Sequence, residues 1–269
     1  MRVFLLMLLV FTFSLFSANN ALLNKSNETG YKIQFDTDNY LDISFNVKDI
    51  NFEDISTEKG MFTSISIDNG YSTRIEGSPA LPTFHELIAM PYGAEPEVEV
   101  LSYDSKIYKL SELGIDYPIM PTQPSYSKSS KPEDRHFIYN ESAYSSTKFT
   151  DLEIASISKS GTMRGVGVGV LKVNPFRYNP IEGTIEVLNN LKVRVSYINA
   201  GPRAEEIKAK SYSPYFKSSF NTLINYKSSS LKADTLMRYP VTYLIVASDA
   251  LSLNTDLQRL IDWKTEKGF

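Results

Sequence analysis

Residues 184–197 read TIEVLNNLKVRVSY, and the pattern of this stretch decides the class of fold. Apolar and polar side chains alternate on both sides of Asn189 and Asn190, which is the period of a strand with one buried face. Because asparagine tolerates a positive φ, the pair predicts a tight turn between strands 184–188 and 191–197. We therefore expect a β-hairpin within a mainly β, antiparallel protein.

The same alternation recurs in stretches 41–47, 65–67, 98–100 and 166–173. The chain also has 17 Tyr and 15 Phe but a single Trp, a bias toward residues that favour strands. These patterns predict an antiparallel β-sandwich or barrel over residues 22–200. Valines alternate with Gly165, Gly167 and Gly169 in one strand, and no Lys-Ser/Thr follows, so we interpret these glycines as room for a packed neighbour rather than as a phosphate loop.

The amino-acid composition changes between Tyr117 and Arg135. Prolines and serines are interspersed there, so the stretch cannot donate ladder hydrogen bonds regularly and has little apolar surface to bury. We predict a long exposed loop, and long loops in compact domains are often functional.

The C-terminal quarter predicts helices and then a new domain. Residues 205–210 and 214–226 have helical spacing and form a predicted helical linker over 201–238. From residue 239 the apolar run 241–247 predicts a strand buried on both faces, and Asn254 is a candidate N-cap of a following helix. We interpret residues 239–269 as the first βα unit of an incomplete α/β domain.

The N-terminus predicts export. Arg2 precedes an apolar run of about 14 residues, shorter than the roughly 20 that span a bilayer, and small residues place cleavage after Ala18 or Ala21. An uncleaved anchor is the alternative. We expect a signal peptide over residues 1–21, a secreted or cell-surface location, and no membrane attachment after cleavage.

Composition excludes several kinds of site. The chain has no Cys and only two histidines, His85 and His136, so we expect no disulfide, no thiolate nucleophile, no metal centre and no cofactor. Its net charge of −3 gives no basic surface for nucleic acid. The adjacent carboxylates are interpreted as solvated charges, and no catalytic residue is assigned.

Three segments resemble the gingipain-type (family C25) cysteine peptidases. GSPALP (77–82) with IAMPYGA (88–94) resembles a motif of their propeptides, and VNPFRYNP (173–180) with VLNNL (187–191) resembles a second. YLIV (243–246) through the residues up to Phe269 resembles the opening strand and helix of their catalytic region.

This resemblance implies the N-terminal part of a secreted zymogen. The β-sandwich prodomain would assist folding of its own downstream catalytic domain and inhibit it, and that domain would have a caspase-like α/β fold with a His–Cys dyad beyond residue 269. The whole protein would be a cysteine endopeptidase, although this chain alone has no catalytic residue.

The resemblance also gives exposed basic side chains a role. Arg135 is the first candidate to occupy an acidic specificity pocket from the loop, and Lys131 the second; Arg203 and Arg238 are candidate processing sites. Two alternatives stay open. One is a non-enzymatic secreted β-sandwich that binds carbohydrate or protein, which clustered exposed aromatics would favour; the other is a degenerate downstream peptidase that only binds.

Overall fold

The computed structural model describes residues 19–24, 28–131, 135–213, 216–229 and 242–267. The strands are β1 (Asn19–Leu22), β2 (Gly30–Asp36), β3 (Tyr40–Asn46), β4 (Asp49–Thr57), β5 (Gly60–Ser66), β6 (Tyr71–Ser72), β7 (Pro82–Met90), β8 (Glu95–Lys109), β9 (Ala155–Met163), β10 (Val166–Val173), β11 (Phe176–Asn179) and β12 (Thr184–Ile198). The helices are η1 (Leu110–Leu113), α1 (Glu141–Tyr144), α2 (Ala204–Ser211), α3 (Lys217–Phe220), α4 (Asp249–Ser252) and α5 (Thr255–Glu266). Every pair of neighbouring strands is antiparallel, which confirms the predicted mainly β class.

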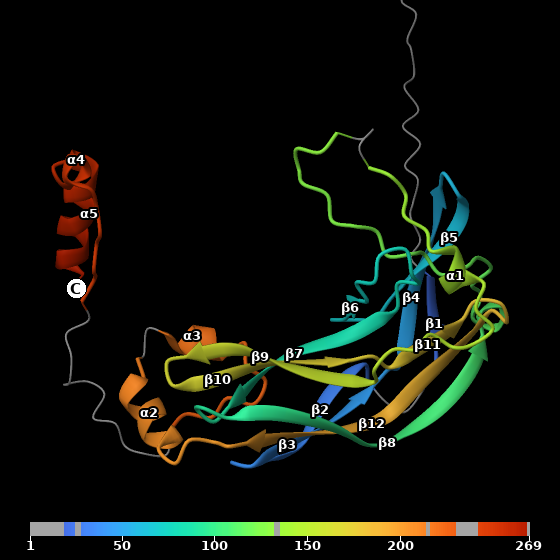
Figure 1. Ribbon diagram of the computed structural model, residues 1–269, viewed down its shortest axis with the longest axis horizontal. Coiled ribbons are helices and arrows are strands. Elements are labelled where there is room, and N and C mark those ends of the chain that lie inside the picture. The colour runs from blue at the N-terminus through green and yellow to red at the C-terminus, as the bar shows by residue number, and fades with distance from the viewer. Residues whose placement is uncertain (1–18, 25–27, 132–134, 214–215, 230–241, 268–269) are drawn as a thin grey trace, which may run out of the picture.

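Two sheets pack face to face (Figure 1). One has the order β6-β7-β10-β9, and the other the order β11-β12-β3-β2 with β8 on the far side of β12. The buried rings of Phe45 on β3 and Phe84 on β7 meet across the interface, with centroids 5.3 Å apart. A third, smaller sheet, β1-β4-β5, continues the sandwich at one end.

The hairpin predicted at residues 184–197 is wrong, because β12 is one strand of 15 residues. Asn190 does have a positive φ of 47°, but it forms an irregularity within the strand instead of a turn. β12 stays extended because partners flank it on both sides: β8 along its length, and β11 and β3 along its two halves. The local pattern could not show these partners, which are distant in sequence.

The alternating glycines of β10 are close-packed, as predicted. A Cβ on Gly169 would lie 3.1 Å from the Met90 sulfur, and one on Gly167 would lie 3.1 Å from the Pro91 carbonyl oxygen. Arg164 and Gly165, with φ of 46° and 78°, form the two-residue connection between β9 and β10. β9 and β10 therefore form a tight hairpin, and β4 and β5 form another through Glu58 and Lys59.

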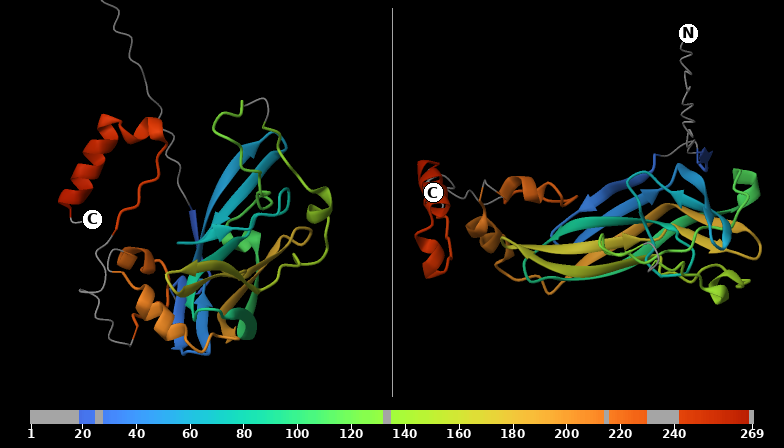
Figure 2. Two further views of the ribbon diagram at one scale, coloured as in Figure 1. Left: turned by 60° about the vertical axis from the view of Figure 1, so that its left-hand side comes forward. Right: turned by 90° about the horizontal axis from the view of Figure 1, so that it is seen from above.

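The described residues of the range 204–229, which we call the arm, lie against the end of the sandwich (Figure 2). Helix α2 confirms the helix predicted at 205–210, but the helix predicted at 214–226 is limited to the four residues of α3. The chain turns after α3 because Phe220 and Leu223 pack into a second apolar cluster with Val166 of β10. The Ile224 N–H then donates to the Leu87 carbonyl (2.9 Å).

The strand predicted at 241–247 is not formed in its described part, 242–247, which has no regular structure. Leu244 and Val246 are 82% and 89% exposed. A parallel strand needs a neighbouring strand and covering helices, and the described residues supply neither. The following helix is confirmed: Asn254 caps α5 by accepting from the N–H groups of Asp256 and Leu257.

Glu86 places a carboxyl on the inner face of β7, opposite the buried Leu171 of β10. Burial raises its pKa to about 7. Because the pKa is higher in the fold than in the unfolded chain, the stability linked to this proton is complete below about pH 4.5 and is lost as the pH rises through 7. Glu86→Gln should therefore gain about 1 kcal/mol relative to the unmodified chain between pH 5 and pH 8, after allowance for solvent screening.

Urea unfolding of both chains at the two pH values measures this difference. Glu53→Gln, on an exposed position of β4, is the control and should show no such change. A Glu86→Gln chain whose stability follows the same pH dependence as the unmodified chain would contradict the assignment.

Candidate functional site

The candidate site is the projecting loop, residues 124–136, of which 132–134 lie outside the described residues. It rises from the sandwich near β4, β5 and α1 (Figure 1). The segment leading into it is hydrogen-bonded on both sides: the Thr63 N–H donates to the Pro118 carbonyl and the Ala80 N–H to the Met120 carbonyl (2.8 and 2.9 Å). The Gly77 N–H donates to the Thr122 carbonyl (2.8 Å), so the loop leaves the sandwich from a fixed point.

One side chain closes the base of the loop, which we call the neck. The Gln123 amide donates to the Ile138 carbonyl and accepts from the Ile138 N–H, both at 2.9 Å. A second link lies further out, where the Tyr126 hydroxyl donates to the His136 carbonyl (2.8 Å). The outgoing and returning segments of the loop are thus joined by side-chain hydrogen bonds and not by a β-ladder, which the prolines would interrupt.

Aromatic rings anchor the returning chain. Phe62 on β5 contacts the rings of Phe137, Tyr139 and Tyr144, with centroids 5.7–6.2 Å apart. The Tyr144 hydroxyl donates to the Ile119 carbonyl (2.5 Å), which ties the returning chain to the entering segment. Burial raises the pKa of Tyr144 far above its usual range, so its hydroxyl keeps the proton that this bond needs.

The described part of the loop presents basic side chains to solvent. Lys128, Lys131 and Arg135 are all exposed, as the sequence predicted. One guanidinium nitrogen of Arg135 donates to the Ser130 carbonyl (3.1 Å) within the loop. Arg135 is therefore held near the backbone of the described part of the loop, and its exposed side chain remains accessible to a partner.

The structure places the other predicted residues apart from this loop. Arg203 is exposed at the start of α2 and pairs with Glu206 (3.0 Å), and Arg238 lies outside the described residues. Ala18 also lies outside them, whereas Ala21 is buried within β1 opposite Ile50 of β4.

The histidines do not form a catalytic group in the described structure. The His85 ring stacks on Tyr71 (centroids 4.8 Å apart), and burial together with Lys172 and Arg74 lowers its pKa. His136 lies in the projecting loop. Among the described residues, no group of three or more His, Asp or Glu side chains could hold a metal ion, and no helix is long and apolar enough to cross a membrane.

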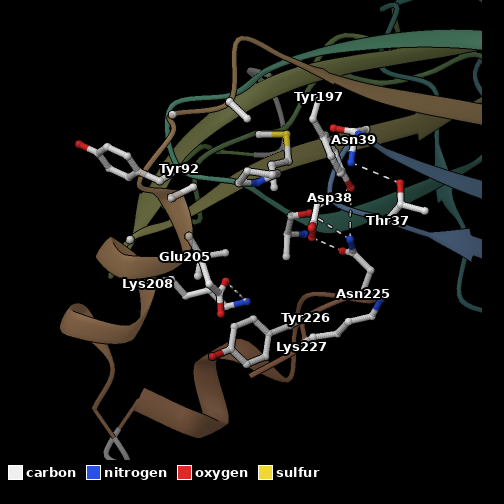
Figure 3. Close-up of a pocket in the computed structure, with 18 of the residues that line it drawn as sticks. Thr37, Asp38, Asn39, Tyr92, Tyr197, Glu205, Lys208, Asn225, Tyr226 and Lys227 are labelled. Carbon is white, nitrogen blue, oxygen red and sulfur yellow. Dashed lines mark hydrogen bonds and ion pairs between the residues drawn. The ribbon is translucent and has the colours of Figure 1, made fainter. Parts of the chain in front are cut away.

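A cavity of about 460 Å³ lies between the arm and the sandwich (Figure 3). Polar groups on its walls bond one another. Asn225 accepts from the Ala89 N–H (2.7 Å) and donates to its carbonyl (3.0 Å), and Lys227 pairs with Asp36 (2.7 Å). We interpret this cavity as the seam where the arm docks, since these contacts hold the arm to β7 and β2.

Comparison with known proteins identifies the family. A family model described as Propeptide_C25 matches residues 24–230. The chain belongs to the Propeptide_C25 family. This confirms the resemblance drawn from the two propeptide motifs, and the β-sandwich is a gingipain-type propeptide domain.

Curated relatives agree with this identification. Lys-gingipain of Porphyromonas gingivalis is 35% identical over 229 residues, which are 85% of this chain. Gingipain R2 of the same organism is 25% identical over 228 residues, or 84% of the chain. The chain spans 13% of the length of the first relative and 30% of the second.

Two solved structures share the fold. One, described as "Structural insight into zymogenic latency of gingipain K from Porphyromonas gingivalis", matches with a TM-score of 0.62 and 34% identity over 67% of this chain and 98% of its own. The other, "Complex of Porphyromonas gingivalis RgpB pro- and mature domains", has a TM-score of 0.58 and 24% identity, and covers 73% and 98% of the two chains.

The exposed loop predicted from Tyr117 starts too early, because Ile119 and Pro121 are buried where this segment bonds to the sandwich. The sequence also missed the residues that shape the loop. Gln123 and Phe62 carry no motif, and the partners that fix the loop, Ile138 and Phe137, are 15 residues or more away from them. Gly77 was interpreted only as part of a family motif. In the structure its φ is 76°, and an added Cβ would lie 3.0 Å from the Asn140 backbone nitrogen. A glycine required for close approach could have predicted that two segments meet there.

Gln123→Ala should loosen the neck. The substitution removes the acceptor of the Ile138 N–H, so we expect hydrogen exchange at that amide to accelerate at least about tenfold, the effect of losing roughly 1.4 kcal/mol of protection. Gln34→Ala is a matched control, because the exposed Gln34 also donates a side-chain hydrogen bond, to Ser44 on β3, far from the neck. Unchanged exchange at Ile138 in the Gln123 variant would contradict a role in closing the neck.

Proposed function

We propose that this propeptide domain holds a gingipain-like cysteine peptidase in a latent state and assists its folding, with its own downstream catalytic domain as the partner. The observation that supports the proposal is the projecting loop, closed at its neck and carrying exposed basic residues. The described part of the loop is held by hydrogen bonds before binding, so it loses little conformational entropy when it binds. The structure named for the zymogenic latency of gingipain K, which shares this fold, supports the same function.

The exposed basic side chains of the loop give the proposal a mechanism. A guanidinium can form two parallel charge-assisted hydrogen bonds with a carboxylate, so an acidic specificity pocket would bind Arg135 strongly. Lys131, on the same loop, is the second candidate. In either case the prodomain would occupy the pocket that a basic substrate residue needs.

The structure also bears on where the chain is cut. Cleavage after Ala21 would remove most of β1, whose Asn20 side chain donates to Asn51 of β4 (2.9 Å), whereas cleavage after Ala18 keeps β1 whole. We therefore favour Ala18 as the signal cleavage point and an exported, non-membrane product. For processing we favour Arg238 over Arg203, because a cut at Arg203 falls at the start of the docked arm.

Inhibition in trans tests the mechanism. The chain is added to a Lys- or Arg-specific gingipain, and the inhibition constant is compared for the unmodified chain, Arg135→Ala, Lys131→Ala and the control Lys128→Ala. We expect the Arg135 variant to weaken inhibition about 30-fold, as loss of a charge-assisted contact predicts, and the control to change it less than about threefold. If inhibition is unchanged in both the Arg135 and Lys131 variants, the proposed binding of a basic loop residue in the specificity pocket is wrong.

The alternative of a carbohydrate- or protein-binding surface has less support. Its expected sign was a cluster of exposed aromatics on one sheet face. The exposed rings on the strands are instead spread over three of them: Tyr31 and Phe35 lie on β2, Tyr71 on β6 and Tyr103 on β8.

A further inference from the structure

The long strand β8 has one edge without a strand partner. It pairs with β12 along one side, and the described strands supply no partner for the other side. Residues 101–107 are all exposed, so neither face of the strand is covered there. In Figure 1, β8 forms the outer rim of its sheet.

The strand carries solvent-exposed apolar side chains next to this edge. Leu101, Tyr103 and Ile107 are 42%, 41% and 55% exposed, and they alternate along one face of the strand. Exposed strand edges of this kind are templates for pairing with another strand, and proteins normally protect them with charges. Within the exposed stretch 101–107 the charged residues are Asp104 and Lys106, which flank Ser105; Glu95, Glu97, Glu99 and Lys109 lie toward the two ends of β8.

The order of these residues is self-complementary. If two copies of β8 pair in antiparallel orientation about a two-fold axis at Ser105, Asp104 of each copy lies opposite Lys106 of the other. Tyr103 then lies opposite Ile107. Opposite charges and aromatic–β-branched pairs are favourable across strands, and each is worth about 0.2–1 kcal/mol.

A shifted register loses this match. A two-fold axis at Ser105 pairs position i of one copy with position 210 − i of the other. Only this axis places Asp104 of each copy opposite Lys106 of the other. The pair of Asp104 and Lys106 therefore favours this one register between two copies.

We propose that the edge of β8 at residues 101–109 is a dimerisation surface, through which two copies of this chain join their sheets in antiparallel register centred on Ser105. A strand pair buries less than the roughly 800 Å² per partner of a standard interface, so we expect a weak dimer with a dissociation constant in the micromolar range. The projecting loop rises on the other side of the sandwich from β8 in Figure 1, so pairing leaves it accessible. The proposal is independent of the inhibitory function.

A cysteine at the axis tests the register directly. The chain has no cysteine, so Ser105→Cys introduces a single thiol that faces its own copy across the axis at a Cα–Cα distance of about 4.5–5.5 Å. Ser102→Cys is the control: its copies would be offset by six residues, about 20 Å, which no disulfide can bridge. Under mild oxidation of the chain beginning at Asn19, we expect the Ser105 variant to form disulfide dimers at least tenfold faster than the control.

Charge exchange provides a second measurement. Asp104→Lys or Lys106→Asp alone places like charges opposite each other, and each should raise the dissociation constant measured by sedimentation at least tenfold. The double exchange restores opposite charges and should return the constant to within about threefold of the original. It does not restore the hydrogen bond from Asn190 to Asp104 (2.6 Å) or the contact of Lys106 with the Tyr108 ring, so recovery would come from the interface.

Three outcomes would overturn the proposal: an unmodified chain that stays monomeric at millimolar concentration, equal crosslinking rates for the Ser105 and Ser102 variants, or a double exchange that dimerises no better than the single ones. A dimer formed through another face, or an edge used by a different protein, gives the second outcome.

Discussion

Phe84→Ala is expected to lower the free energy of unfolding by about 3–5 kcal/mol, the range for removing a buried phenylalanine ring. Phe84 projects from β7 and is 1% exposed, and its ring meets Phe45 of the facing sheet. The lost ring leaves a cavity at the point where the two sheets are held together. Because small domains are stable by only about 5–15 kcal/mol, this one change should remove a large part of the total.

Urea denaturation followed by far-ultraviolet circular dichroism measures the change. Phe35→Ala is the matched control, since Phe35 lies on β2 and is 61% exposed. We expect the control to shift stability by less than about 0.5 kcal/mol, as at other surface positions. Equal losses in the two variants would mean that the contact between the sheets does not limit stability.

Alternation in the sequence predicted the strands well where one face is buried and the strand is regular. Val166–Val173 is the clearest example, since the predicted stretch and β10 coincide. The stretch 41–47 was also predicted, but its polar positions were expected to face water. Asp42 is instead buried, and its burial is compensated because the Arg194 guanidinium of β12 donates to both of its carboxylate oxygens at 2.7 Å. Such pairs join residues far apart in sequence, and no local pattern contains them.

The same reason explains the two clearest errors. Asn189-Asn190 has the composition of a hairpin turn, but β8 pairs with residues on both sides of it and holds the strand straight. The apolar run at 242–247 has the composition of a buried strand, yet it has no partner strand among the described residues and stays exposed. In both cases the available partner, rather than propensity, decided the conformation.

The candidate site was predicted only in outline. Proline and serine content located the loop and its basic residues, because those depend on local composition. Its fixed position depends on Gln123 and on the ring cluster around Phe62, which are contacts between segments. The sequence could therefore suggest what the loop presents but not how it is held.

Gly165→Ala should be the most damaging glycine substitution and should act on the arm. Gly165 has a φ of 78°, and an added Cβ would lie 2.9 Å from the Ile207 carbonyl oxygen in α2. The backbone strain alone costs about 1–2 kcal/mol, and the contact with helix backbone adds about 1–3 kcal/mol because that atom cannot rotate away. We expect a loss of about 3–4 kcal/mol in stability, or release of α2 from the sandwich.

Gly183→Ala separates these two causes. Gly183 has a φ of 58°, but an added Cβ there would meet no atom within 4 Å, so it should cost only the backbone strain. Hydrogen exchange across residues 204–211 should accelerate in the Gly165 variant and stay unchanged in the Gly183 variant. If the two substitutions instead cost the same and leave exchange in α2 unaltered, close packing of α2 on the β9–β10 connection does not hold the arm, and residues 204–229 behave as a linker.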